Sequence, residues 1–424
     1  MMKQMAANGE ANSPAEDQTG LTGLAPRVTI SGFCDDPQTL DTVRQALLDR
    51  RMARTHGSLH EGGIDAAIEY CSTEVTPNVM IIETRLEREP LFRALNELAE
   101  LCDAGTKVIL VGPTNDVALY RDLMRHGVSE YLVTPVTSMQ LIEAVLGLFS
   151  DPEGGRLGRL ISFFGAKGGA GSSTISHNVG WMIAERLDDD VIIADFDLPF
   201  GTAGLDFNTD PAQGIADALN APERIDDLLI DRLLTKCSER LSLLTAPGQL
   251  DGETKVDEGN VEKLLSALRS SAPYVIADLP HQWTAWTRHV LHNSDEVVIT
   301  ATPDLAGLRN TKQLVDWLKA SRPNDLPPRV VLNQTGIPKR SEISVQEFTR
   351  VCGIESPVVV GFDGPLFMNA TNNGQMLSQI SPNAKAVETI GELATVVSGR
   401  KIPAKRSFFS LKLFGSGKLK RKGA

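Results

Sequence analysis

The stretch LISFFGAKGGAGSST, residues 160–174, decides the fold of the second half of the chain. A short apolar run leads into a glycine-rich segment, and apolar residues then recur with helical spacing at Ile175, Val179 and Ile183. The order is strand, loop and helix, which is the context in which such a loop binds phosphate. The loop glycines are Gly165, Gly168, Gly169 and Gly171. Glycine lets the backbone turn its N–H groups inward, and the helix N-terminus adds positive potential, so we predict a phosphate loop. A structural turn is the alternative.

The loop lacks its usual lysine. In the pattern G-x-x-x-x-G-K-[ST] the lysine would occupy position 172, where this chain has Ser172. Its loss removes a charge-assisted contact worth roughly 1.5 to 3 kcal/mol, or about ten- to over a hundredfold in phosphate affinity. We predict that binding survives on main-chain N–H groups. Fast hydrolysis does not, because little cationic charge remains to stabilise the transferred phosphate.

Outward from the loop, apolar runs alternate with helical stretches along most of the chain. The runs include RVTISGF, VMIIE, KVILVG and EYLVTP before the loop, and DVIIADFD, LSLLTAP, YVIADLP, EVVITATP, RVVLNQTG and PVVVGFD after it. Short apolar strands between helices indicate parallel sheets. The sequence therefore predicts two α/β domains, the second with a doubly wound sheet.

Composition shifts predict the domain boundaries. Residues 1–26 are polar and lack periodicity, which indicates a disordered leader. A first α/β domain is predicted over 27–149, a glycine-rich linker over 150–159 and the second domain over 160–399. Residues 400–424 form a basic tail.

The tail differs in charge from the rest of the chain. It holds nine Lys or Arg and no acidic residue, whereas the remainder holds 33 basic and 54 acidic side chains, a formal charge of −21. Basic residues alternate there with Phe408, Phe409 and Leu411, a composition that suits an anionic membrane surface or an acidic partner. A solvated tail is the alternative. The acidic body disfavours nucleic acid as a partner.

The cysteines and histidines carry little functional signal. The five cysteines are scattered without a C-x-x-C pair, which favours a reducing cytoplasm over a disulfide framework. His289 and His292 have helical spacing but no third ligand, so no zinc site is predicted there.

Lys167 carries a resemblance to a known family. It matches the signature lysine of the deviant loop K-G-G-x-G-K-[ST] of the MinD and ParA ATPases. The blocks AKGGAGSSTISHN, ADFDLPFGTAGLDF, GIADALNAPERIDDLLIDRLLTKC and TPDLAGLRNTKQL look like the CpaE (TadZ) pilus-assembly proteins, which often lack the second loop lysine. The resemblance covers about 27–399. It implies an α/β fold in which a receiver-like (flavodoxin-like) domain precedes a P-loop, doubly wound, mostly parallel sheet of the MinD/ParA type.

The resemblance implies a site for ATP and Mg²⁺. The nucleotide-binding residues that it implies are Gly165, Lys167, Gly168, Gly169, Ala170, Gly171, Ser172, Ser173, Thr174 and Asn333. Lys167 would be catalytic, reaching across a homodimer to the partner's phosphates, while Ser173 binds magnesium and Thr174 contacts phosphate. Asn333 would contact adenine, with a structural Asx turn as the alternative.

Three aspartates are the candidates for magnesium and water. Asp195 and Asp197 are two residues apart at a strand end, so both are predicted to point to one side. By resemblance, Asp195 helps to organise magnesium and Asp197 is catalytic, orienting the attacking water. Asp278 follows the apolar YVIA and matches a Walker B aspartate that holds magnesium partly through water. A solvated strand end, or a cap for the next helix, is the alternative for these carboxylates.

The first domain resembles a phosphoryl-accepting receiver that has lost its chemistry. Asp35 and Asp36 could form the acidic pair, but Glu83 stands where the accepting aspartate belongs, and Thr134 stands where the lysine belongs. Glutamate is one methylene longer, which misplaces the nucleophile. We predict a docking module that acts without phosphorylation.

The function expected from the resemblance is spatial organisation. A cytoplasmic dimer, peripheral to the inner membrane, would position a type IV/Flp (Tad) pilus or secretion system at a cell pole with weak or no ATP hydrolysis. Its partners would be assembly proteins there and, through residues 400–424, an anionic membrane. The alternatives are an active ParA-type ATPase that segregates cargo or DNA, and a nucleotide-free scaffold.

Overall fold

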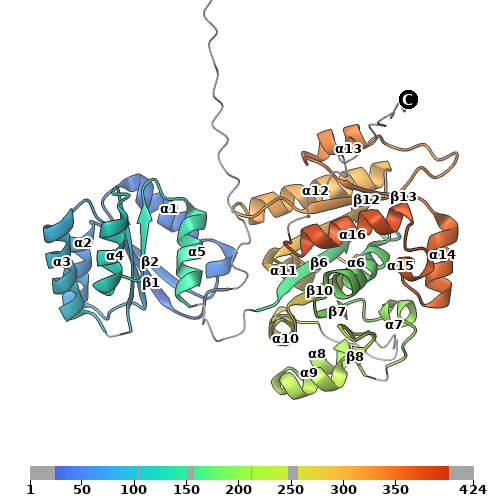
Figure 1. The fold of residues 1–424 in the computed structure, drawn as a ribbon, viewed down its shortest axis with the longest axis horizontal. Coiled ribbons are helices and arrows are strands. Elements are labelled where there is room, and N and C mark those ends of the chain that lie inside the picture. Colours follow the sequence, from blue (N-terminus) through green and yellow to red (C-terminus); the bar gives the residue numbers. More distant parts are fainter. Residues whose placement is uncertain (1–23, 104, 150–156, 212, 247–255, 401–424) are drawn as a thin grey trace, which may run out of the picture.

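The structure is a computed structural model, and it contains two α/β units in succession (Figure 1). It describes residues 24–103, 105–149, 157–211, 213–246 and 256–400. Each unit is built on a sheet, and nearly all strand pairs are parallel, so the predicted fold class is confirmed. Most of the predicted leader, linker and basic tail lies outside the described residues, but Ala25, predicted in the leader, is buried and donates its backbone N–H to Arg51 O at 2.7 Å.

The first unit is a five-stranded parallel sheet in the order β2-β1-β3-β4-β5. Its strands are β1 (Thr29–Cys34), β2 (His56–Glu61), β3 (Val79–Glu83), β4 (Lys107–Gly112) and β5 (Glu130–Val133). Its helices are α1 (Pro37–Leu47), η1 (Arg50–Met52), α2 (Ile64–Thr73), α3 (Arg88–Leu101), α4 (Val117–Arg125) and α5 (Ser138–Leu148). This strand order is the flavodoxin-like one, in agreement with the predicted receiver-like fold.

The second unit is an eight-stranded sheet in the order β13-β12-β11-β6-β10-β7-β9-β8. Its strands are β6 (Arg159–Gly165), β7 (Val191–Asp195), β8 (Thr235–Lys236), β9 (Leu241–Leu244), β10 (Tyr274–Leu279), β11 (Glu296–Ala301), β12 (Arg329–Thr335) and β13 (Val358–Gly361). Its helices are α6 (Ser172–Leu187), α7 (Ala203–Asp206), α8 (Ile215–Asn220), η2 (Pro222–Arg224), α9 (Asp227–Leu233), α10 (Glu258–Ser271), α11 (Ala285–Asn293), α12 (Leu305–Ser321), α13 (Val345–Cys352), α14 (Gly364–Asn373), α15 (Leu377–Ile380) and α16 (Lys385–Val397). Among the described strands of this sheet, only the short β8 pairs antiparallel, with β9.

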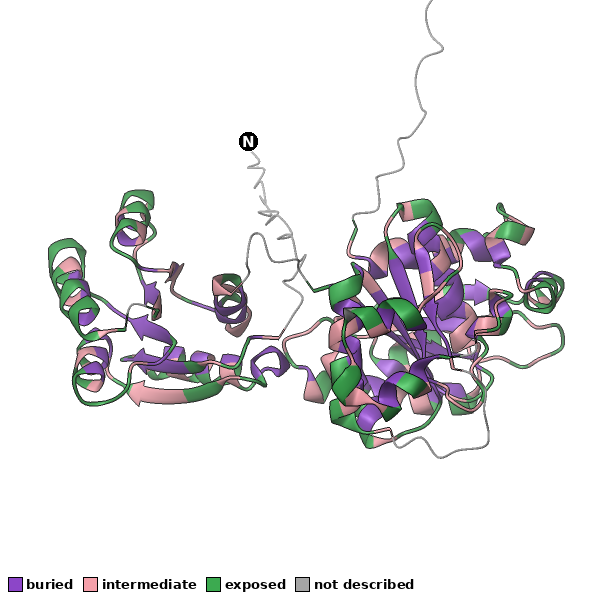
Figure 2. Ribbon diagram, turned by 90° about the horizontal axis from the view of Figure 1, so that it is seen from below, coloured by how far each residue is buried: buried purple, intermediate pink, exposed green. Residues whose placement is uncertain are grey.

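Helices cover both faces of the second sheet, and this explains its continuous apolar strands. Along β6, Leu160 and Phe164 enter one core cluster, whereas Ile161 and Phe163 enter the cluster on the opposite face. Side chains alternate in this way because successive residues of a strand point to opposite faces. Figure 2 shows most strands of both sheets buried, with exposed residues on the outer helix faces and along the edge strand β2.

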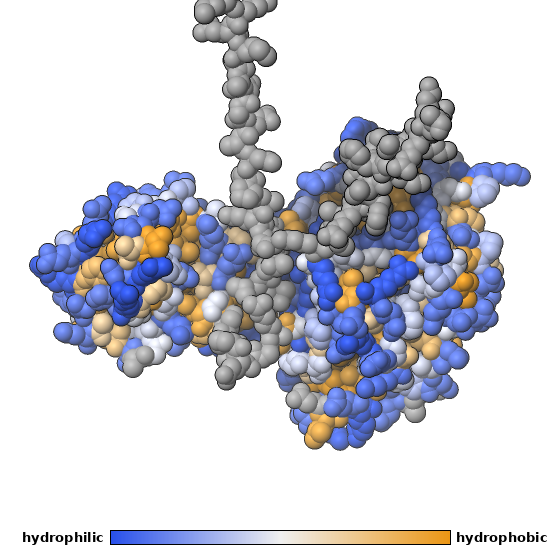
Figure 3. Space-filling view, in the orientation of Figure 1, coloured by the Kyte–Doolittle hydropathy of each residue, from blue (hydrophilic) through white to orange (hydrophobic). Residues whose placement is uncertain are grey.

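The face of the molecule shown in Figure 3 is mostly hydrophilic. Hydrophobic side chains gather at the lower end of the second unit, over α8 and α9, where Leu228 is exposed.

Several elements differ from the sequence-based prediction. The sequence over 37–53 predicts one helix, but α1 ends at Leu47, because Asp49 caps a separate turn, η1, by accepting a hydrogen bond from the backbone N–H of Arg51. Strand β2 was not predicted, since it is an edge strand without a buried apolar run.

The two units meet at a buried group of charges, which we call the Asp325 cluster (Arg50, Arg51, Arg322 and Asp325). The Asp325 carboxylate accepts hydrogen bonds from Arg50 Nε at 2.8 Å and Arg322 Nε at 2.6 Å, and it pairs with Arg51 Nη2. All four side chains are no more than 8% exposed. Burial alone would raise the pKa of Asp325, but the three guanidinium groups hold it at about 2.

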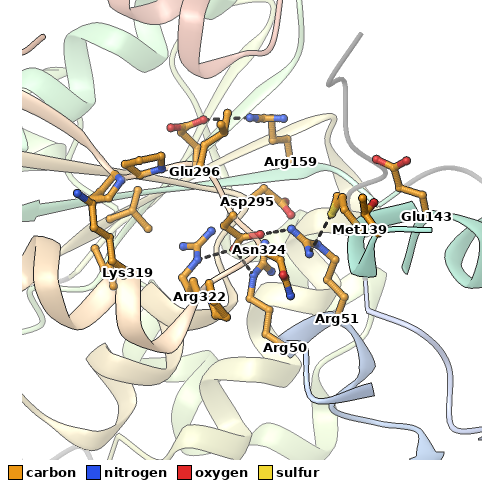
Figure 4. Close-up of a pocket in the computed structure, with 18 of the residues that line it drawn as sticks. Arg50, Arg51, Met139, Glu143, Arg159, Asp295, Glu296, Lys319, Arg322 and Asn324 are labelled. Atoms are coloured by element: carbon orange, nitrogen blue, oxygen red, sulfur yellow. Dashed lines mark hydrogen bonds and ion pairs between the residues drawn. The ribbon is translucent and has the colours of Figure 1, made fainter. Parts of the chain in front are cut away.

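The Asp325 cluster lies beside a cavity of about 620 Å³, shown in Figure 4. Most of the cationic lining groups already have carboxylate partners: Arg159, for example, pairs with Glu296 at 3.2 Å. Helix α12 reaches this region with its last turn, because Arg322 is its C-terminal cap.

Candidate functional site

The glycine loop lies at the point of the second sheet where ligands are expected. Strand β6 is flanked by β10 on one side and β11 on the other, and the loop joins its carboxyl end to α6. In open α/β sheets, ligands bind beyond the carboxyl ends of the strands where the strand order reverses. The predicted loop residues, 165–174, therefore occupy a binding position that the topology itself creates.

The loop backbone requires glycine at two points. Gly169 has φ 75° and Gly171 has φ 87°, both in the left-handed region. A Cβ added to Gly171 would lie 2.4 Å from Asn333 Nδ2, whereas one added to Gly168 or Gly169 would meet nothing within 4 Å. The loop thus packs tightly on one side and faces open space on the other.

Side chains from other elements hold the loop carbonyl groups. Asn333 Nδ2 donates to Ala170 O at 2.9 Å, Gln334 Nε2 donates to Gly169 O at 3.1 Å, and Asn310 Nδ2 donates to Ala166 O at 2.8 Å. The backbone N–H groups of Ala166 and Ala170 donate to Thr300 O and Lys167 O, and the N–H groups of Gly168, Gly169 and Gly171 are the loop donors proposed for an anion. Helix α6 begins at Ser172 with no side-chain cap, so its first N–H groups are available to a phosphate.

Asn333 contacts the loop itself in this structure. Its side chain is buried, with the amide nitrogen on Ala170 O and Oδ1 accepting a hydrogen bond from the backbone N–H of Gln334 at 2.9 Å. These contacts brace the loop and place Asn333 next to the candidate nucleotide site.

The three hydroxyl residues Ser172, Ser173 and Thr174 form the first turn of α6. Ser172 Oγ is buried and has no hydrogen-bond partner among the described residues. The carbonyl oxygens of the other two bond within the helix, Ser173 O accepting from Ser176 and Thr174 O from Asn178. A serine at position 172 therefore leaves a polar atom unsatisfied beside the loop.

Lys167 forms an ion pair with Asp304 of the same chain. Its Nζ lies 2.7 Å from Asp304 Oδ2, and both side chains are about one-third exposed. Asp304 also caps α12, with Oδ1 accepting from the backbone N–H of Gly307 at 2.8 Å. Burial alone would raise the pKa of Asp304, but hydrogen bonds from Lys167 and Thr302 lower it to about 2. The pair holds the lysine against α12.

Asp195 and Asp278 lie side by side because β7 and β10 pair in register at these residues. Both are almost fully buried. Burial and the neighbouring charge of Asp278 raise the pKa of Asp195 to about 7. Asp195 accepts hydrogen bonds from the backbone N–H groups of Asp197 at 3.0 Å and Ala203 at 3.1 Å, which fold the following turn onto the strand end.

The prediction that Asp197 extends the strand beside Asp195 is wrong. Strand β7 ends at Asp195, and the chain then turns, because the backbone N–H of Asp197 donates to the Asp195 carboxylate. Asp197 is half-buried in this turn, and burial raises its pKa.

The sequence analysis missed His177, a residue of α6 whose side chain is fully buried. Its Nδ1 lies 2.7 Å from Asp206 Oδ2, and its Nε2 lies 3.4 Å from Asp278 Oδ2. Burial alone would lower the pKa of His177, but the two carboxylates raise it to about 10. Its position four residues after Ser173 places both on one face of α6, which is the one signal that the sequence offered.

The site residues fit a phosphate and a divalent cation. The uncapped start of α6 and the open side of the loop suit phosphate oxygens. Asp278 Oδ1 is buried without a hydrogen-bond partner in the described part of the chain, which leaves a ligand atom at the strand end. Carboxylates and a hydroxyl are the ligands that Mg²⁺ uses beside nucleotide phosphates.

The corresponding pocket of the first unit is closed by its own hydrogen bonds. Glu83 is buried, and its carboxylate accepts from the backbone N–H of Asp36 at 2.9 Å and from Thr39 Oγ1 at 3.3 Å. Asp35 accepts from the backbone N–H of Gly63 at 3.0 Å. The carboxylate that replaces the accepting aspartate is thus engaged within the unit.

Comparisons with known proteins place the fold of the second unit among ATPases. A family described as AAA domain matches residues 158–325. The septum site-determining protein MinD of Helicobacter pylori is 24% identical over 263 residues, which are 59% of this chain and 96% of that protein. The crystal structure of a ParA family ATPase from Chlorobium tepidum is 26% identical, with a TM-score of 0.51, over 56% of this chain and 98% of that one. The second unit is a P-loop domain of the MinD/ParA class.

The first unit identifies the family more closely. The crystal structure of the pilus assembly protein CpaE from Caulobacter crescentus is 45% identical to this chain, with a TM-score of 0.30, and the match covers 30% of this chain and 98% of that one. On the strength of this sequence identity, the chain belongs to the CpaE-like pilus assembly proteins. No helix among the described residues is long and apolar enough to cross a membrane.

Proposed function

We propose that the chain is an ATP-binding, MinD/ParA-like localisation factor for the assembly of a Tad/Flp (type IV) pilus or secretion system. It acts as a nucleotide-dependent homodimer with weak or no ATP hydrolysis, close to the inner membrane at a cell pole. Its partners are the assembly proteins found there. The family of the chain supports the pilus role, and the relatives of its second unit support the use of nucleotide.

The observation that carries the proposal is a phosphate loop without its lysine at the carboxyl end of β6. Residues 165–171 form the loop, and α6 starts uncapped at Ser172, so main-chain N–H groups are available for the triphosphate. Ser173, Asp195 and Asp278 would hold Mg²⁺, partly through water, and the ion would supply positive charge beside the phosphates.

Weak hydrolysis follows from the charge balance of the site. Ser172 contributes no cation, and Lys167 is engaged with Asp304 on its own chain. Little positive charge therefore remains to stabilise the transferred phosphate within one protomer. Asp197, half-buried near the strand end, is the proposed residue for orienting water.

A calorimetric titration of the full chain with ATP and magnesium, combined with a turnover assay, tests the proposal. Tight binding with turnover near background supports a localisation factor. Brisk turnover stimulated by membrane or DNA would replace the proposal with an active ParA-type ATPase. If no binding is detected, the chain is a nucleotide-free scaffold.

Restoring the loop lysine should strengthen ATP binding. The variant Ser172→Lys is expected to lower the dissociation constant about ten- to a hundredfold, because a charge-assisted contact worth roughly 1.5 to 3 kcal/mol is regained. It also removes the buried Oγ that has no partner among the described residues. Calorimetry checks the change, and Ser172→Gln, which lengthens the same side chain without adding charge, is the matched control. Unchanged affinity would mean that the loop has adapted to serine.

The basic tail should bind anionic membranes. Residues 401–424 lie outside the described residues, and the expectation rests on their charge and aromatic content. Removing residues 400–424 should abolish flotation of the full chain with anionic liposomes, while neutral liposomes serve as the control. Equal flotation of both forms would show that the tail does not contribute to membrane binding.

A further inference from the structure

Three side chains that could bind a metal ion lie close together on the buried side of α6. One ligand atom each from His177, Asp195 and Asp278 lies within 4.8 Å of the other two. The three residues come from α6, β7 and β10, and none is more than 2% exposed. Fully buried polar groups normally have a hydrogen-bond partner or a bound ion.

Two of these groups have unused ligand atoms. His177 Nε2 and Asp278 Oδ1 are buried, and neither makes a hydrogen bond within the described part of the chain. Leaving a buried polar atom unsatisfied destabilises a protein by about 1 to 3 kcal/mol. Both atoms are therefore available to a ligand that the described part of the chain does not itself supply.

The other ring nitrogen of His177 has the partner typical of a metal-binding histidine. Nδ1 lies 2.7 Å from Asp206 Oδ2 at the end of α7. Such a carboxylate holds one proton on Nδ1, so a metal ion that displaces the second proton, from Nε2, can bind the Nε2 lone pair. Asp206 is itself buried and accepts a hydrogen bond from Thr202 Oγ1 at 3.4 Å, so its position is held.

The distances suit one shared cation. Metal–nitrogen and metal–oxygen bonds are about 2.0 to 2.2 Å long, so neighbouring ligand atoms on one ion lie about 3.0 to 3.5 Å apart. His177 Nε2 and Asp278 Oδ2 are 3.4 Å apart. The 4.8 Å limit of the whole group exceeds the spacing of neighbouring ligand atoms by about 1.3 Å, so side-chain movements of about that size must bring the three groups onto one ion.

Charge also favours a cation. Three buried carboxylates, those of Asp195, Asp206 and Asp278, surround one imidazole, and no lysine or arginine is paired with any of them in the described residues. Burying net negative charge is costly unless positive charge accompanies it, and either a second proton on His177 or a metal ion bound in its place supplies that charge.

We propose that His177, Asp195 and Asp278 bind a divalent transition metal ion of the Mn²⁺ or Zn²⁺ type, and that they do so without nucleotide. The imidazole sets the preference, because Mg²⁺ and Ca²⁺ take oxygen ligands, whereas first-row transition ions accept nitrogen as well. The site shares Asp195 and Asp278 with the proposed magnesium site, and to that extent it rests on the proposed function.

Manganese is the probe that tests the site, since it binds carboxylate and imidazole but has little affinity for the free cysteines of the chain. The full chain, stripped of metal and nucleotide, is titrated with Mn²⁺ in excess Mg²⁺, and paramagnetic resonance measures the free ion. We expect one bound Mn²⁺ per chain, and electron spin-echo modulation from a coordinated imidazole nitrogen.

Variants assign that nitrogen. His177→Gln should remove both the bound ion and the modulation. His289→Gln is the matched control, because His289 also pairs with a carboxylate, Glu262 at 3.2 Å, but lies half-buried on α11, and this variant should keep both signals. If His177→Gln does not fold, Asp206→Asn replaces it and should weaken Mn²⁺ binding about ten- to a hundredfold while keeping the nitrogen signal.

The outcomes separate this inference from the proposed function. Bound Mn²⁺ without nitrogen modulation, or no binding in the absence of nucleotide, overturns the inference and leaves a protonated His177 as the buried cation. If ATP nevertheless binds with Mg²⁺, the proposed function stands. If Mn²⁺ binds with nitrogen modulation but ATP does not bind, the metal site stands and the proposed function fails.

Discussion

Lys167→Ala should abolish ATP-dependent dimerisation of the chain. In the proposed dimer this lysine contacts the phosphates bound by the partner, and Ser172 leaves no second lysine in the loop to compensate. ATP binding to the single protomer should change little, because main-chain N–H groups make most of the phosphate contacts. Light scattering at saturating Mg·ATP should report a monomer mass for the variant and a dimer mass for the parent chain.

Asp304→Asn is the matched control for this prediction. In the structure Lys167 is held by Asp304 at 2.7 Å, and this bond must break before the lysine can reach a partner. Asparagine caps helices as well as aspartate does, so α12 should keep its first turn while the competing charge disappears. The control should dimerise at least as readily as the parent. A dimeric Lys167→Ala variant would refute the role of the lysine across the interface.

Asp325→Ala should destabilise the protein by about 3 to 5 kcal/mol, because it leaves buried guanidinium groups without their shared carboxylate. Arg50, Arg51 and Arg322 all pair with Asp325, and none is more than 8% exposed. The loss should appear in denaturant unfolding followed by circular dichroism. Because two of the arginines belong to the first unit, proteolysis near residues 150–156 should also become faster.

Asp316→Ala is the control for Asp325→Ala. Asp316 pairs with Lys312 one helical turn away on α12, and both side chains are more than 40% exposed. Exposed pairs of this kind contribute about 0.3 to 0.5 kcal/mol, so the control should unfold almost as the parent does. Equal effects of the two substitutions would show that the Asp325 cluster contributes no more than a surface pair.

The fold class and the phosphate loop could be predicted because their signals are contiguous in the sequence. Strand, loop and helix follow one another within residues 159–187, and each has its own periodicity or glycine pattern. The pairing of Asp195 with Asp278 follows from the same logic, since both end strands of one parallel sheet.

The remaining features depend on contacts that no local pattern contains. His177 is a candidate site residue because its ring nitrogens lie next to Asp206 and Asp278, which are 29 and 101 residues further along the chain. The Asp325 cluster joins residues about 275 positions apart, and in the sequence its arginines resemble ordinary solvated charges. Strand β2 escaped prediction because an edge strand needs no continuous apolar run.

Helix α12 connects two of these features physically. Its N-terminal cap, Asp304, grips Lys167, and its C-terminal cap, Arg322, belongs to the cluster at the seam between the units. The helix has 17 residues and is therefore a rigid strut about 25 Å long. A tilt of the first unit against the second would move Arg322 at one end of α12. Because the helix is rigid, it would also shift Asp304, and with it Lys167, at the other end. In the proposed dimer, such a movement would change how readily Lys167 leaves Asp304.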